Sequence, residues 1–532
     1  MQPSTFNSPR LRFLVAGPLS PRPGGRRGRI LLAELAERLT QSSLALDVDV
    51  GPALGAAGEL KIKAKFSRFR DFSVTEVVQQ SLGELHRLRE RLLAPSGRPR
   101  SDELLAQVAR IAGRGPLHAE IAACFAPPPE KPADPGGGDL VDELLARGSA
   151  PPKSAASSAI DALVRGGVQS TPAGAGVEPS RAAHAALSAA LARAATAVLA
   201  DPKLRAAELR WRSLRLFLSQ CPRDPELDVE LLDVDPAGLP AALAELAELD
   251  PLARPDAIFL LDPLASLAEA AAIAEVAADL HAPVCAELDP AALGRAGTAA
   301  IAAGVAQDLG LGDEFEALRD DPASRWLTLA VNGPVLAAEA TPAGERVLAG
   351  GAALAVAALI ASSLRLGGTL AQIGRDADLR APATWSFRHG QEDIPIATAE
   401  RCSAEDQLAL ARRGLTALGG PQQSDLLTLA ACPVVHRSDE PTSLAGQLLV
   451  GRTVRFALWV RHRIPAGASP EQAADAVTRA AALMLLPGTP LRPRFGAALN
   501  QGESGPELKI GASFPAGLAG HPVALSFALP IS

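Results

Sequence analysis

The chain has 532 residues, which is enough for two to four domains that each bury a core of their own. Its formal net charge is −7 and no sustained basic face offsets it, which argues against nucleic acid as a main partner. With 48% hydrophobic residues and many alanine-rich helical segments, the chain is expected to fold.

Cysteine use and hydropathy indicate the compartment. The five cysteines lie far apart without a CxxC pair, which is typical of buried thiols in a reducing compartment. Cys432 and His436 supply two ligands, whereas a structural zinc site needs four. The apolar run at residues 13–17 is too short for a signal peptide. Residues 347–364 are long enough for a membrane span, but half are Ala or Gly, which favours a buried helix. We therefore expect a soluble, cytoplasmic protein without membrane insertion.

The first part of the chain predicts strands and short helices. Residues 11–16 are apolar and predict a strand that ends in a Pro/Gly-rich turn. Residues 60–66 alternate between apolar residues and three lysines, which predicts a half-buried strand with a solvated lysine face in preference to an anion site. Residues 30–39 have helical spacing, and the residues of one face are Leu31, Leu35 and Leu39.

A further helix is predicted to begin after Ser73. The Ser73 hydroxyl can accept the amide three residues on while Glu76 reaches back, a capping box worth about 1 kcal/mol. The predicted buried stripe of this helix consists of Val74, Val78, Leu82, Leu85 and Leu92.

A linker is predicted between two bodies. Residues 126–138 read APPPEKPADPGGG, where the prolines make the first half stiff and the glycines make the second half flexible. Residues 148–180 are rich in Ala, Ser, Pro and Gly and predict a second flexible stretch. Between them, residues 139–147 predict a two-turn helix that needs a partner to become ordered. Its apolar face would consist of Leu140, Val141, Leu144 and Leu145. The predicted division is a domain at 1–125, a linker at 126–180 and a domain at 181–532.

The second part of the chain predicts an α/β body. After a long helix, Leu204, Ala207, Trp211, Leu214 and Leu218 form one apolar stripe, with Arg205, Arg212 and Ser213 turned away from it. Residues 227–235 alternate and predict a strand. Residues 257–261, 264–280 and 282–288 predict strand, helix and strand, a βαβ crossover with a parallel pair. The expected fold class is therefore α/β, or mixed α+β, with several layers.

The end of the chain predicts a hairpin. Two alternating sets would line its inner face: Leu508, Ile510, Ala512 and Phe514, then Val523, Leu525, Phe527 and Leu529.

The sequence contains none of the common catalytic motifs. There is no GxxxxGK[ST], GxSxG or HExxH, and the Gly-Gly pairs lack the order of a nucleotide-binding loop. We expect no enzyme, no catalytic residue, no cofactor and no metal site, and we interpret His281 as a capping or core residue.

Several segments resemble subunits of the contractile sheath of the type VI secretion system. FSRFRDFSVTEVVQQSLGELHRLRERLLAP resembles the small sheath subunit, with Val74 in place of a proline, and this likeness covers about residues 10–115. ADPKLRAAELRWRSLRLFL followed by DVELLDVDPAGL, the block at residues 255–294, and GPELKIGASFPAGLAGHPVALSFALP resemble the large sheath subunit. The family's extended N-terminal strand and its "LPYG" segment are absent, and the large-subunit part is shorter than usual.

This resemblance implies a small and a large sheath subunit fused in one chain. Such a protomer would form a helical homopolymer around an inner tube protein, attach to baseplate components and contract to propel the tube. In the family, an AAA+ ATPase recognises a helix like residues 139–147, so Leu140, Val141, Leu144 and Leu145 are the expected recognition residues. The terminal hairpin is either shared between protomers or an ordinary hairpin of its own domain. The inter-protomer strand candidates are Leu508, Ile510, Phe514, Val523, Leu525 and Phe527.

Two alternatives remain open. The missing N-terminal strand is compatible with a sheath-derived assembly adaptor. The predicted βαβ unit is compatible with a ligand-binding α/β protein or enzyme, which would need a pocket with convergent polar groups at the strand ends.

Overall fold

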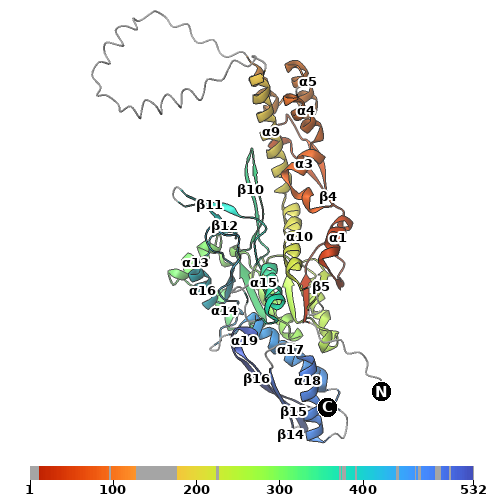
Figure 1. Cartoon of the computed structure of the whole chain (residues 1–532), viewed down its shortest axis with the longest axis vertical. Helices are drawn as coiled ribbons and strands as arrows, with labels where there is room; N and C mark the ends of the chain where they lie inside the picture. The colour runs from red at the N-terminus through yellow and green to blue at the C-terminus, as the bar shows by residue number, and fades with distance from the viewer. Residues whose placement is uncertain are drawn as a thin grey trace, which may run out of the picture.

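The computed structural model describes residues 11–94, 98–126, 177–222, 227–370, 373, 379–389, 392–438, 442–461, 463–464, 469–485, 493–502 and 505–530. They form an elongated molecule with a helical arm at one end, a central sheet between layers of helices, and a C-terminal layer at the other end (Figure 1). The fold is mixed α/β, as the sequence predicts.

The central sheet has seven strands in the order β13-β8-β7-β6-β1-β5-β2. Their bounds are β1 Leu11–Ala16, β2 Arg26–Arg29, β5 Leu227–Asp233, β6 Ala257–Leu260, β7 Val284–Glu287, β8 Leu327–Val331 and β13 Leu415–Ala417. Neighbouring strands are parallel except β2, which pairs antiparallel with β5 at one edge. The parallel pair β6 and β7 is joined by helix α12 (Leu267–Leu280), which confirms the predicted crossover.

Strand β1 lies inside this sheet, between β5 and β6. In the register, Phe13 is opposite Val229 on one side and Ala257 on the other. Phe13 and Val15 face one layer of helices and Leu14 faces the other, and all three are fully buried. A strand covered on both faces needs a near-continuous apolar run, and residues 11–16 supply one.

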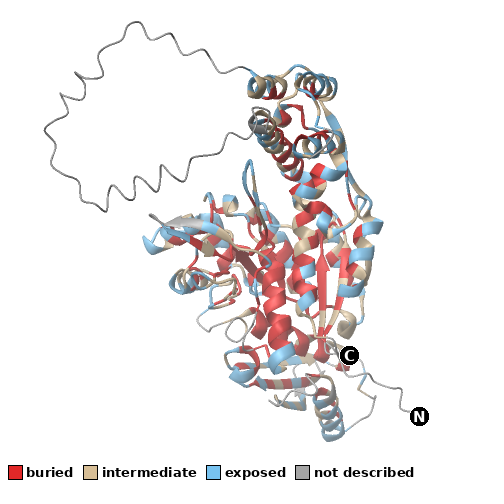
Figure 2. Cartoon of the chain, turned by 45° about the horizontal axis from the view of Figure 1, so that its top comes forward, coloured by how far each residue is buried: buried red, intermediate tan, exposed pale blue. Residues whose placement is uncertain are grey.

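Helices cover both faces of the sheet. On one face lie α10 (Pro202–Gln220) and α15 (Ala352–Gly367), and on the other lie α11 (Leu239–Ala244), α12 and α14 (Asp313–Asp320). Helices α13 (Thr298–Ala306) and α16 (Ala404–Arg412) pack against each other beside this body. Figure 2 shows that buried residues concentrate in the central sheet and in α15.

The uncharged segment at residues 347–364 is buried, as predicted, but it is not one helix. Residues 347–349 end strand β10 (Gly344–Ala349), and α15 begins at Ala352. Gly350 and Gly351 separate the two elements with φ of 143° and 73°, values that an L side chain rarely adopts.

The arm is built from both halves of the chain. Its helices are α1 (Leu35–Ser42), α2 (Gly51–Leu54), α3 (Val74–Ser81), α4 (Gly83–Leu93), α5 (Ser101–Ala112), α6 (Pro116–Phe125) and α9 (Val177–Leu199). Within α9, the segment Pro179–Leu199 is long and apolar enough to cross a membrane, by length and composition alone. In its most apolar 18-residue window, 56% of the residues are buried, and α9 contacts α3, α4 and α6, as the core helix of a bundle does.

Most predictions for the arm are confirmed. Strand β4 (Lys61–Phe66) pairs with β3 (Leu44–Asp49), and its three lysines are exposed, two of them opposite Asp47 and Asp49, so the lysine face is solvated. The five residues of the predicted stripe are buried, although the helix divides at Leu82 into α3 and α4. Leu35 and Leu39 are buried, but Leu31 is 42% exposed because α1 begins only at Leu35.

The predicted capping box is only half formed. Ser73 Oγ accepts the amide of Glu76 at 3.3 Å. The Glu76 carboxylate instead accepts from Gln80 Nε2 at 3.1 Å. The first amide of α3, that of Val74, donates to Glu339 at 2.9 Å, so the end of this helix is held by a residue 265 positions away.

The C-terminal layer and two hairpins complete the fold. The layer contains α17 (Leu444–Arg461), α18 (Pro470–Met484), β14 (Arg494–Gly502), β15 (Gly505–Phe514), α19 (Ala516–Ala519) and β16 (Val523–Pro530). The hairpins are β9 (Val335–Thr341) with β10, and β11 (Trp385–His389) with β12 (Glu392–Ile396). The predicted terminal hairpin is β15–β16, and β14 extends it to a three-stranded antiparallel sheet.

Candidate assembly interface

The inner face of the C-terminal sheet packs on the helices of its own layer. Leu508 and Ile510 of β15 are fully buried in a cluster with Phe456 of α17 and Val477 of α18. Period-two alternation places every second residue on this face, as the sequence predicts.

The six strand candidates therefore point into the chain's own core. Leu508, Ile510, Phe514 and Val523 are buried, and Leu525 and Phe527 are half-buried. Their side chains form the inner face, so a neighbouring chain would meet the backbone edges and the outer face of this sheet instead.

That outer face is made mostly of small residues. Its exposed members are Arg494, Gly496, Ala498 and Asn500 of β14, Lys509 and Ser513 of β15, and Ala524, Ser526 and Ala528 of β16. Within the described residues, β14 and β16 each have a strand neighbour on one side only. An edge strand presents a row of unpaired N–H and C=O groups, which can pair with another strand.

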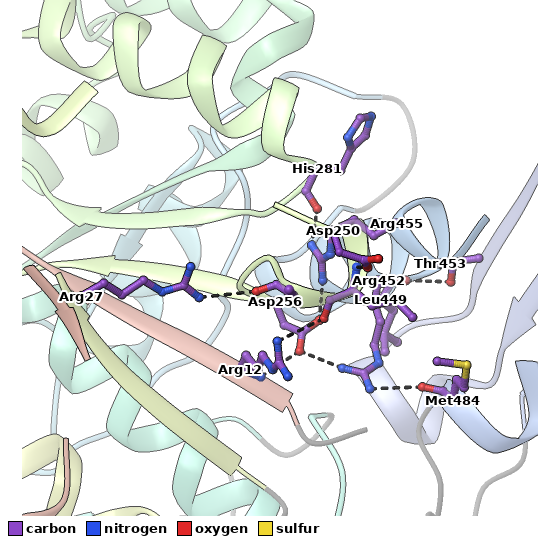
Figure 3. Close-up of polar contacts among 12 residues, drawn as sticks. Arg12, Arg27, Asp250, Asp256, His281, Leu449, Arg452, Thr453, Arg455 and Met484 are labelled. Carbon is purple, nitrogen blue, oxygen red and sulfur yellow. Dashed lines mark hydrogen bonds and ion pairs between the residues drawn. The ribbon is translucent and has the colours of Figure 1, made fainter. Parts of the chain in front are cut away.

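A buried ion cluster joins the C-terminal layer to the central sheet (Figure 3). Asp256, immediately before β6, accepts from Arg452 Nη1 at 2.7 Å and is also paired with Arg455, both of α17. Its Oδ2 accepts the amide of Arg12 in β1 at 2.8 Å. Arg455 Nη1 also donates to the carbonyl of His281, at the C-terminal end of α12, at 2.5 Å. One carboxylate thus connects β1, β6 and α17.

In this cluster, one buried carboxylate pairs with two buried guanidinium groups. Asp256, Arg452 and Arg455 are 4%, 6% and 1% exposed. Burial lowers the pKa of Arg455 to about 10, although Asp256 favours its charged form, so the guanidinium stays charged at neutral pH. Buried charges of this kind are stable only when they are paired and hydrogen-bonded.

A second ion network joins α10 to the arm. Glu208, fully buried on α10, is paired with Arg346 of β10 and accepts from Arg212 Nε at 2.7 Å. Arg346 also contacts Glu339 at 3.2 Å, and Glu339 in turn accepts the first amide of α3. The network connects the hairpin β9–β10, α10 and α3.

A cavity of about 480 Å³ lies at the carboxyl ends of β1, β5 and β6, where α/β proteins often bind ligands. Its two carboxylates already have partners. Asp262 forms a bidentate pair with Arg210 at 2.5 and 2.8 Å, and Glu269 accepts the amide of Ala265 at 2.9 Å. Its other described lining residues are apolar residues, glycine and prolines, so the described lining offers no convergent polar groups.

The remaining candidates from the sequence are the predicted recognition residues, His281 and possible metal sites. Leu140, Val141, Leu144 and Leu145 lie outside the described residues. His281 is the C-cap of α12 with φ of 52°, consistent with the capping interpretation. The described part of the chain contains no group of three or more His, Cys, Asp or Glu side chains that could hold a metal ion.

The ion clusters were not predicted from the sequence. Arg452 and Arg455 lie three residues apart in an otherwise mostly apolar helical segment, and this pattern could have predicted buried positive charge. Nothing in the sequence selects Asp256 as their partner, since it lies 196 positions from Arg452.

No protein-family model and no curated protein matches the chain. Solved structures with partial likeness are a chain of the anti-feeding prophage baseplate (15% identity, TM-score 0.28) and of its contracted helical sheath (14%, 0.31). The baseplate match covers 50% of this chain and 62% of the baseplate chain. The sheath match covers 55% of this chain and 72% of the sheath chain. A third is the contracted PVC sheath complex of an extracellular contractile injection system (12% identity, TM-score 0.33), covering 60% of this chain and 76% of that one. Similarities this low do not by themselves assign a function.

Proposed function

We propose that the chain is a structural protomer of a contractile sheath of the type VI secretion kind, with small- and large-subunit parts fused. The proposal rests on the sequence resemblance and on one structural observation: a three-stranded sheet stands at the end of the molecule, attached through α17, and among the described residues no strand pairs with its two outer edges.

Such a sheet suits polymerisation. A strand from a neighbouring copy can add to an open edge through backbone hydrogen bonds, which gives a strong contact that still allows the two bodies to change their relative position. A contractile polymer needs two packings of the same protomer, separated by a modest free energy per copy.

The position of β1 supports the fusion. Residues that resemble the small subunit supply a strand inside the sheet formed by residues that resemble the large subunit. Covalent fusion fixes the ratio of the two parts at one to one and raises their effective concentration for each other.

The remaining partners follow from the same proposal. The tube formed by the sheath would enclose an inner tube protein and meet baseplate components, in the cytoplasm. An AAA+ ATPase would bind residues 139–147 of the contracted form through Leu140, Val141, Leu144 and Leu145. These assignments depend on the resemblance alone.

The test uses the outer face of β16. Ala524→Lys combined with Ala528→Lys adds two charges to an exposed edge strand without touching the buried face, and charged side chains on an edge oppose strand addition. We expect this variant to remain folded by circular dichroism and to form no tubes in negative-stain electron microscopy.

Ala45→Lys provides the matched control, because Ala45 is also exposed on a strand but lies in the arm. It should form tubes like the unmodified chain. Normal tubes from the double β16 variant would exclude this edge as the assembly contact.

A further inference from the structure

The cavity at the carboxyl ends of β1, β5 and β6 lies where the chain changes direction across the central sheet. From β1 the chain passes the end of β5 to reach β2, and the amide of Gly25 donates to the carbonyl of Asp233 at 2.8 Å. From β6 the chain leads the other way, through α12 to β7. Because the chain leaves β1 and β6 in opposite directions, a crevice opens between the two connections, and open α/β sheets bind ligands in crevices of this kind.

The floor of this cavity is the apolar core of the sheet. Every lining residue is described, and so is every residue of the three turns at 16–18, 234–240 and 260–264. Ala16, Leu260 and Ile273 are at most 3% exposed and belong to the core cluster between the sheet and helices α11 and α12. A molecule in the cavity would therefore contact this core directly.

The lining offers few hydrogen-bond donors. Four of its fifteen residues are prolines, which carry no N–H group. The amides of Gly17 and Leu264, two further lining residues, already donate to carbonyls of the neighbouring strands at 3.1 and 2.8 Å. A ligand that depends on hydrogen bonds finds few partners here, so recognition in this cavity depends on apolar contact.

The charges around the cavity favour neither an anion nor a cation. Its charged lining residues are the carboxylates Asp262 and Glu269, and residues 235–321, which supply most of the lining, contain 17 Asp and Glu against 3 Arg and no Lys. This excess of negative charge repels an anion. A cation finds both carboxylates already bound, to Arg210 and to the amide of Ala265, and burial of an unpaired charge is costly.

We propose that this cavity binds a small uncharged apolar molecule. Its volume of about 480 Å³ is in the usual range for small-molecule sites. Water in the cavity has few hydrogen-bond partners, and an apolar group gains affinity when it displaces such water. Residues 16–18 belong to the N-terminal part of the chain and the rest of the lining to the C-terminal part, so the ligand contacts both. The site does not depend on the sheath proposal, because binding is measured whether or not the chain forms tubes.

The experiment uses two fluorescent probes, phenylnaphthylamine and anilinonaphthalene sulfonate. They share one aromatic body, and only the sulfonate is charged. Each is titrated into the full chain, and the rise in fluorescence in an apolar site is followed. We expect saturable one-site binding of the uncharged probe and roughly ten-fold weaker binding of the sulfonate, because its charge finds no partner in the cavity. Absence of saturable binding by the uncharged probe, or equal affinities for the two probes, would overturn the proposal.

Two variants of α12 locate the site. Ala272 is exposed and lines the cavity, so Ala272→Trp places a large side chain at its opening. This variant should bind the uncharged probe at least about ten-fold more weakly, because the ring competes for the same volume. Ala268→Trp is the matched control: Ala268 is exposed one turn earlier on α12 and does not line the cavity, so affinity should not change. Both variants should fold normally by circular dichroism. Equal affinities for the two variants would place the binding elsewhere and overturn the assignment.

Discussion

Asp256 is the residue on which the junction between the central sheet and the C-terminal layer depends. It compensates two buried arginines of α17 and also binds the backbone of β1. A buried ion pair gives weak evidence for net stability, because desolvation offsets attraction, but removal of one partner leaves a buried charge without compensation. The cluster therefore fixes how α17 sits on the sheet.

Asp256→Ala is expected to destabilise the chain by about 3–5 kcal/mol, because it removes the carboxylate that pairs with the buried Arg455 and Arg452 and accepts the amide of Arg12. Urea unfolding followed by circular dichroism measures the effect. Asp250→Asn is the control: Asp250 contacts Arg463 at 3.2 Å on the surface, and an exposed pair contributes at most about 1 kcal/mol. A loss below about 1 kcal/mol for Asp256→Ala would show that solvent reaches the two arginines.

Glu287 is a second residue with a defined electrostatic role. Its Oε2 accepts the amides of Gly351 and Ala352, at the start of α15, at 2.7 and 3.0 Å. Burial raises the pKa of Glu287 to about 7, although these two hydrogen bonds favour the charged form. The carboxyl group therefore gains or loses its proton near neutral pH.

This pKa predicts a pH dependence of stability. A carboxyl whose pKa is higher in the folded state binds its proton more tightly there, so protonation stabilises the folded state. This contribution to the free energy of unfolding is fully present below about pH 4.5 and is lost as pH rises through about 7. For a partly buried group we expect a decrease of roughly 2–3 kcal/mol in the free energy of unfolding across this window.

Glu287→Gln removes the titrating proton and should flatten this part of the profile, measured by urea unfolding at several pH values between 5 and 8. Glu345→Gln, at an exposed position on β10, should leave the profile unchanged. If the free energy of unfolding of the Glu287→Gln variant still falls with pH as it does in the unmodified chain, other groups cause the pH dependence.

At the scale of elements, hydrophobic periodicity and capping signals predicted where helices and strands occur better than they predicted which elements pack against one another. The predicted stripe of α10 is buried at Leu204, Trp211, Leu214 and Leu218, whereas its fifth member, Ala207, is half-buried. Ser213, expected to face away, is 2% exposed because the opposite side of α10 meets Gly351 at the start of α15. Helical spacing identifies one apolar face but does not show that a second element covers the other.

Turn signals explain a second difference between the predicted and the observed elements. The sequence contains Gly350-Gly351 inside the uncharged segment, and positive φ at both positions ends β10 before α15 begins. Hydropathy alone merges such a strand and helix into one element, whereas the glycine pair is a local signal that they are separate. Alternation predicted the hairpin β15–β16 and its buried face, but the third strand, β14, was not predicted.

At the scale of the whole molecule, the two halves of the chain share one sheet. Residues 11–16 stand between β5 and β6, so the segment 139–532 alone would lack a central strand and expose the apolar faces beside it. We expect segments 1–125 and 139–532 to co-purify when expressed together. The larger segment alone should be poorly soluble.

The control deletes residues 1–17 from the smaller segment, which removes β1 and leaves the helices of the arm. Co-purification should then be strongly reduced. Two halves that stay separate, each folded and soluble, would contradict the central place of β1.

The most direct test of the sheath proposal is electron microscopy of the purified full chain. We expect hollow helical tubes whose subunits contact one another through the β14–β16 sheet, and loss of these tubes in the double Lys variant of β16. Monodisperse particles that form no tubes at any protein or salt concentration, alone or with an inner tube protein, would contradict it.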